Sequence, residues 1–154
     1  MGAAVTFSKA IRDYLQADSS IAALVSEEIY PVRYPQIDQS TAQFPAILHR
    51  LIRAETLTPM EAGPGQADIL YRTLRQFEII SETYDEVETL SGLVNARLHG
   101  LRGTFTDAGP DLVVQSCLLN TASDQIIVGD GANPFELFVR ALQYEVVTRG
   151  ASPL

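Results

Sequence analysis

The 154-residue chain has no tryptophan, one cysteine (Cys117) and two histidines (His49 and His99). A single cysteine excludes a disulfide within the chain and fits a reducing compartment. No apolar run reaches the roughly 20 residues that a membrane-spanning helix needs. The first residues also lack the basic region and long apolar run of a secretion signal. We therefore expect no membrane segment, and a fold that depends on its hydrophobic core.

Positive charge is scarce. The chain has 11 Lys and Arg residues against 19 Asp and Glu residues, which gives a net charge of −8. A subunit that grips nucleic acid needs clustered basic residues to neutralise phosphates, so this balance argues against that role. An acidic surface suits instead a wall along which DNA slides without being bound.

Residues that support catalysis are equally sparse. No Cys, Asp or Glu stands at metal-ligand spacing beside either histidine, and His99 falls near a predicted helix end, where a cation interacts favourably with the dipole. Cys117 lies in an apolar strand pattern, which is typical of an inert buried thiol. The glycine-containing segments 63–65 and 129–131 match no phosphate-binding motif. The sequence therefore predicts no catalytic residue, no cofactor-binding residue, no metal ligand and no enzymatic activity.

Hydrophobic residues make up 46% of the chain, enough for one domain with a core. The clearest local pattern is a strand over residues 69–81 followed by a helix. Thr83 stands three residues before Glu86, which is a capping box. Helical apolar spacing follows, and Gly100 and Gly103 are stop signals.

The remaining elements follow from periodicity and turn residues. We expect helices over residues 6–17 and near 21–25, strands over 44–53, 112–120 and 135–148, and long loops over 57–67 and 123–134. The fold class predicted is α+β, with a four-stranded, mainly antiparallel sheet, helices packed on one face and two long loops. Residues 1–154 form a single domain in this prediction, with flexible ends at 1–5 and 150–154. Along the last strand, Phe138, Leu142, Tyr144 and Val146 are expected to face the core.

The two long loops carry apolar residues that are unfavourable in water. These candidate protein-contact residues are Leu57, Pro59, Met60, Ile126, Ile127 and Val128. They either dock on a partner protein or fold back as a small addition to the core, and the sequence leaves both alternatives open. Four arginines, at positions 50, 53, 72 and 75, leave a similar choice. They form a basic stripe that contacts DNA, or they pair across strands with Glu55 or Glu78, or with acids of a neighbouring subunit. Pairing is the favoured interpretation.

Several short segments together resemble the tail-completion, or tail-terminator, proteins of long-tailed phages and gene transfer agents. They are Ile21–Val25, Ile29–Pro31, Phe44–Leu48, Arg72–Ser81, Val94–Gly103 and Phe138–Val146. The resemblance runs from about residue 7 to about residue 148 and depends on the order and spacing of elements. The segments 57–67 and 122–134 match nothing in the family.

This resemblance implies a structural virion protein located at the head-proximal end of the tail, and in the host cytoplasm before assembly. Such proteins form a homohexameric ring that caps the tail tube, stops its polymerisation and joins it to the head–tail connector or neck protein. The implied partners are further copies of the chain, the major tail tube protein and the connector, with DNA passing through the lumen without specific binding. A neck or head-completion subunit is the alternative, and a small α+β enzyme is a weaker one.

Overall fold

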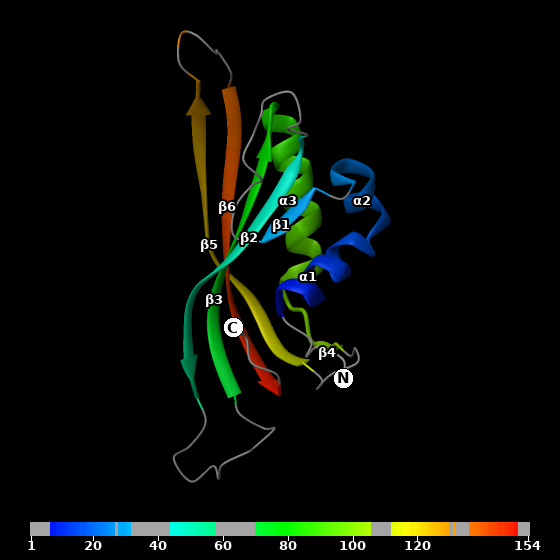
Figure 1. Ribbon diagram of the computed structural model, residues 1–154, viewed down its shortest axis with the longest axis vertical. Helices are drawn as coiled ribbons and strands as arrows, with labels where there is room; N and C mark the ends of the chain where they lie inside the picture. The colour runs from blue at the N-terminus through cyan, green and yellow to red at the C-terminus, as the bar shows by residue number, and fades with distance from the viewer. Residues whose placement is uncertain are drawn as a thin grey trace.

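A computed structural model describes residues 7–26, 28–31, 44–57, 70–105, 112–129, 131 and 136–150. In these residues three helices lie on one side of a curled sheet (Figure 1). The helices are α1 (Phe7–Gln16), α2 (Ser19–Val25) and α3 (Tyr84–Leu98). The strands are β1 (Ile29–Pro31), β2 (Ala46–Thr56), β3 (Leu70–Ser81), β4 (Gly103–Phe105), β5 (Leu112–Val128) and β6 (Glu136–Gly150).

The sheet contains six strands in the order β1-β2-β3-β6-β5-β4. Strand β1 runs parallel to β2, and every other neighbouring pair is antiparallel. The expected four-stranded, mainly antiparallel sheet is therefore wrong, because the sheet is six-stranded and mixed. Strands β1 and β4 are three residues long, too short to give a periodic pattern in the sequence.

The strand-to-helix junction confirms Thr83 as the helix cap, but the Glu86 carboxylate bonds to the Thr83 hydroxyl and not to the Thr83 N–H that completes a capping box. The Thr83 Oγ1 atom accepts a hydrogen bond from the Glu86 N–H at 3.3 Å and donates one to Glu86 Oε1 at 2.8 Å. Asp18 caps α2 in the same way, accepting bonds from the N–H groups of Ser20 and Ile21. These caps satisfy N–H groups that the first turn of a helix leaves without partners.

The core lies between the helices and the covered face of the sheet. All four residues expected to point inward from the last strand do so: Leu142, Tyr144 and Val146 are buried in the core, and Phe138 packs against it. The helices contribute Ile11, Leu15, Ile21, Val25, Val87, Leu90, Val94 and Leu98. The Tyr144 hydroxyl donates to Asn95 Oδ1 at 2.8 Å, so this large buried side chain keeps a polar partner.

The segment expected to be a loop over 123–134 begins as strand. Strand β5 continues to Val128 and pairs with β6 along its whole length, with bulges between Val114 and Ser116 and between Leu119 and Thr121. Each bulge adds one residue to β5 and increases the local twist. The predicted loop over 57–67 lies outside the described residues except for Leu57. The predicted flexible ends at 1–5 and 150–154 also lie outside them, except for Gly150, which is the last residue of β6.

Candidate protein-contact surface

The ends of β5 and β6 form an arm that lies beside α3, and its tip extends beyond β3, because β3 pairs with β6 only as far as Phe138. We define the arm as residues 120–128 of β5 with residues 136–143 of β6. All nine β5 residues of the arm are exposed to solvent. Figure 1 shows β5 and β6 running beside α3, with their tips reaching slightly beyond the first turn of that helix, where none of the described helices covers them. The arm ends in Ile126, Ile127 and Val128, of which Val128 is 70% exposed.

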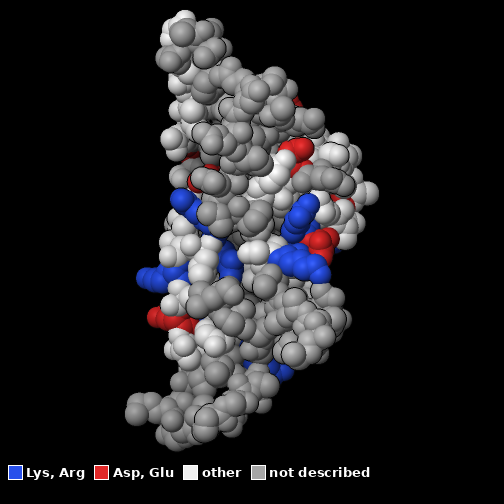
Figure 2. All heavy atoms as spheres, viewed as in Figure 1, with Lys and Arg blue, Asp and Glu red and all other residues white. Residues whose placement is uncertain are grey.

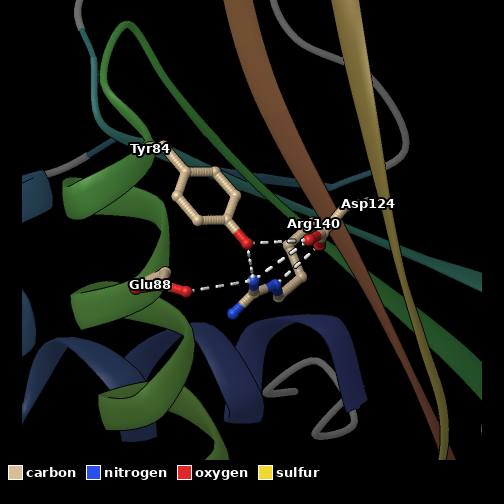
Figure 3. Close-up of polar contacts among 4 residues, drawn as sticks. All are labelled: Tyr84, Glu88, Asp124 and Arg140. Atoms are coloured by element: carbon tan, nitrogen blue, oxygen red, sulfur yellow. Dashed lines mark hydrogen bonds and ion pairs between the residues drawn. The ribbon is translucent and has the colours of Figure 1, made fainter.

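A group of four polar side chains ties the arm to α3 (Figure 3). Arg140 of β6 makes a two-point bond to Asp124 of β5, with Nε to Oδ1 at 2.7 Å and NH2 to Oδ2 at 3.1 Å. The same NH2 group donates to the Tyr84 hydroxyl at 2.9 Å and lies 3.8 Å from Glu88 Oε1. Tyr84 and Glu88 belong to the first turns of α3, so the contacts hold the arm against the start of that helix. We call these four residues the brace.

The brace perturbs the ionisation of its members. The hydrogen bond from Arg140 lowers the pKa of Asp124, and the bond to Asp124 raises the pKa of Arg140. The hydrogen bond to Asp124 raises the pKa of Tyr84. All three shifts stabilise the protonation states present near neutral pH, which is the behaviour of a structural ion pair.

A groove of about 420 Å³ separates α3 from the arm. Its α3 wall is formed by Glu88, Ser91, Gly92 and Asn95, and its floor by Leu119, Ala122, Ser123, Asp124, Arg140 and Leu142. Small side chains on both sides leave it open. Its charged lining residues, Glu88, Asp124 and Arg140, belong to the brace, in which Arg140 contacts both carboxylates.

The opposite, helix-free face of the sheet carries a ladder of paired polar side chains. Arg72 bonds to Glu55 at 3.1 Å and lies 3.5 Å from Glu145. Arg50 lies 3.8 Å from Glu78. This confirms the cross-strand pairing favoured from the sequence for Arg50 and Arg72. The surface view shows the basic side chains of one side of the molecule in a band with acidic ones among them (Figure 2).

Arg75 does not join that face. It is 2% exposed, and its guanidinium carbon lies 4.0 Å from the centre of the Phe7 ring of α1. Burial lowers the pKa of Arg75 to about 10. The alternation of side chains along β3 places residue 75 on the face opposite residues 72 and 76, so a four-arginine stripe does not exist.

Neither histidine has a chemical partner that suggests catalysis. His49 is buried and stacked on Phe77, and neither ring nitrogen has a hydrogen-bond partner among the described residues. His99 Nδ1 accepts a hydrogen bond from the Leu119 N–H at 3.0 Å, which joins the end of α3 to β5 and requires an unprotonated Nδ1. Burial raises the pKa of the Cys117 thiol to about 12. Across the described part of the chain, no three His, Cys, Asp or Glu side chains are grouped to hold a metal ion.

The candidate contact residues lie far apart. Leu57 follows the end of β2, is 36% exposed and donates its N–H to Leu70 O, whereas Ile126, Ile127 and Val128 lie in β5 at the other end of the sheet. Through the strand pairing, Thr56 is level with Val114, so about 40 Å of strand separates the two groups. Pro59 and Met60 lie outside the described residues. The helices described are also all too short and polar to cross a membrane.

The brace was not predicted from the sequence. Its members come from three segments, and the only signal was that Arg140 interrupts the apolar, core-facing positions of the last strand. That position is occupied by a charge because Asp124 lies directly opposite it in β5.

This chain is similar to known proteins in its fold. No family model matches the chain, and no curated protein does. Among solved structures, a chain from the virion of a native gene transfer agent particle aligns with a TM-score of 0.64 and 14% identity, over 94% of this chain and 95% of that one. A second solved chain aligns with a TM-score of 0.48 and 17% identity, over 91% and 89%, which is too weak to support an argument. The first match establishes that the two chains share a fold over almost their whole lengths.

Proposed function

We propose that this protein is a structural, non-enzymatic component of a virion. The supporting observation is the end-to-end fold match with a chain of a gene transfer agent particle. The match spans 94% of this chain and 95% of the other, so it does not depend on a small common substructure. A fold alone does not determine function. The surface features are consistent with the proposal, because the arm exposes apolar side chains that assembly with other proteins would cover.

Within the virion, we propose that the chain forms a hexameric ring at the head-proximal end of the tail tube. The ring ends tube polymerisation and joins the tube to the head–tail connector, and the subunit is made in the host cytoplasm. A cyclic ring uses two different patches on each subunit. DNA crosses its lumen without specific binding, which agrees with the net charge of −8 and with the paired arginines on the helix-free face.

Deletion of the gene tests this role. We expect particles whose tail tubes are longer than normal and not attached to heads, as measured by negative-stain electron microscopy. Supplying the intact gene in trans is the control and restores tail length. Tubes of normal length that fail only to attach indicate a neck subunit and overturn the terminator role. Normal, attached tails without this chain overturn the virion role as well.

A further inference from the structure

Within the part of the chain that the structure describes, two strands of the sheet have outer edges that are unpaired over much of their length. Strand β1 covers only Ile47–His49 of β2, so the outer edge of Arg50–Thr56 has no strand partner among the described residues. Strand β4 covers only Leu112–Val114 of β5. Gly100 and His99 then bond to Cys117 and Leu119, and from residue 120 to 128 the outer edge of β5 is unpaired in the described part of the chain. We call these segments the β2 edge and the β5 edge.

The direction of the main-chain groups along the β5 edge follows from two printed bonds. Cys117 O accepts from Gly100 N–H and Leu119 N–H donates to His99, so both residues point their main-chain groups away from β6. Hydrogen-bonded and non-bonded pairs alternate in an antiparallel ladder. The register past the bulge continues this alternation through Ala122, Asp124, Ile126 and Val128, whose N–H and C=O groups therefore point outward.

The same reasoning applies to the β2 edge. The Ile47 N–H donates outward to Glu28 O, and the Leu57 N–H donates inward to Leu70 O. Alternation between them, with Ile52 as the extra residue of a bulge, directs the main-chain groups of Leu51, Ala54 and Thr56 outward. Each edge thus presents outward-pointing main-chain N–H and C=O groups on several alternating residues.

The exposed apolar side chains coincide with these two edges. Among the described residues, the large hydrophobic side chains that are exposed are Ile52, Leu57, Tyr84, Leu118, Ile126, Ile127 and Val128. Tyr84 belongs to the brace. The others lie on the β2 edge, on the β5 edge or within two residues of them. A long, exposed and partly apolar strand edge promotes pairing with another chain unless a partner covers it.

We propose that the β5 edge of one copy pairs with the β2 edge of the next copy, so that the sheets of neighbouring subunits are continuous. The two edges lie at opposite lateral edges of one sheet, so each subunit has two different contact patches, as a head-to-tail ring requires. The pairings β2–β3, β3–β6 and β6–β5 are all antiparallel, so β2 and β5 run in opposite directions within a subunit. Rotation about an axis along the strands keeps these directions. The β5 edge of one copy and the β2 edge of the next therefore meet as an antiparallel pair. A second copy satisfies both edges at once, whereas a different protein satisfies only one. This inference rests on the proposed ring.

Cysteine pairs test the contact directly. One cysteine replaces Leu51 or Ala54 on the β2 edge, and a second in the same chain replaces Ala122 or Ile126 on the β5 edge. The four combinations sample different registers. The native Cys117 does not compete, because it is buried and its pKa is raised to about 12. The control pairs Ala54→Cys with Gln143→Cys, which lies in β6 one strand away from the β5 edge.

Oxidised particles are analysed by non-reducing gel electrophoresis, and their subunit assemblies by native mass spectrometry. We expect at least one edge pair to give a ladder of linked subunits up to six, and the control pair to give none. If hexamers are present but none of the four pairs forms a link, the edge pairing is refuted and the ring stands. If the chain is absent from particles, or present without forming hexamers, the proposed ring fails together with this inference.

A proline pair separates main-chain pairing from side-chain packing. Ile126→Pro removes an outward N–H and is tolerated at a strand edge, whereas Ile126→Ala keeps that N–H and removes only the side chain. We expect Ile126→Pro to weaken subunit association about five- to tenfold more than Ile126→Ala, as one lost main-chain hydrogen bond per interface predicts. Equal association of the two variants contradicts main-chain pairing. Circular dichroism verifies folding, and the cysteine links decide the matter if the proline variant unfolds.

Discussion

Acid should destabilise this protein through His49. Its side chain is 2% exposed, and its pKa is lowered to about 4 by burial first, then by the positive charges of Arg75 and Arg12. In the unfolded chain the pKa returns to about 6.5. The unfolded state therefore binds more protons between these two values, and the free energy of unfolding falls as the pH falls through this range.

The size of the effect follows from that shift. Relative to pH 8, protonation of the unfolded chain at His49 lowers the free energy of unfolding by about 2 kcal/mol at pH 5 and by about 3 kcal/mol below pH 4. His49→Leu removes the titrating group and keeps a similar volume beside Phe77. Because neither ring nitrogen has a hydrogen-bond partner in the described part of the chain, the substitution loses no bond there, and we expect the two proteins to differ by less than about 1 kcal/mol at pH 8.

Urea unfolding at fixed protein concentration between pH 8 and pH 4 measures both profiles. Carboxylates titrate in both proteins, so the difference between the two curves isolates His49. We expect the wild type to lose about 2 kcal/mol more than His49→Leu between pH 8 and pH 5. Parallel curves would refute the argument, because they would show that His49 has the same pKa in the folded and unfolded chains.

Three further substitutions test local features through urea unfolding at pH 7.5. Arg140→Met breaks the brace and should lower the free energy of unfolding by about 1 kcal/mol. In a double-mutant cycle with Asp124→Asn, additive losses of free energy would contradict the bond between the two residues. Thr83→Ala removes the α3 cap and should also cost about 1 kcal/mol, and no loss would mean that the cap is energetically silent. Leu90→Ala opens a cavity in the core and should cost roughly 2–5 kcal/mol, so a loss below 1 kcal/mol would contradict close packing there.

Local features of α3 and its preceding strand were predictable from the sequence. Strand β3 and the cap at Thr83 lie where residues 69–86 predicted them, within one residue. Both depend on neighbours in the chain: strand-forming side chains in succession, and a hydroxyl three residues before a glutamate. The inward set of β6 was predictable for the same reason, since alternation along one strand is a local property.

The arm was not predictable as a pair of strands, although the sequence indicates three of its residues as candidate protein contacts. The sequence predicts that Ile126–Val128 are apolar residues of a loop, but the structure places them in β5. Residues 120–128 are exposed on both faces, so they lack the alternation by which a half-buried strand is detected. Whether they contact a partner protein remains a prediction that the cysteine links address.

By itself, the sequence determined where α3 begins, which residues of β6 face inward, and that the chain carries few groups suited to catalysis. Tertiary structure decided the number of strands, the pairing of Arg140 with Asp124, and which strand edges remain open. The physical reason is the range of the forces involved. Caps and side-chain alternation are set within a few residues, whereas the brace depends on cross-strand register and on a helix 40 residues away in the chain from Asp124.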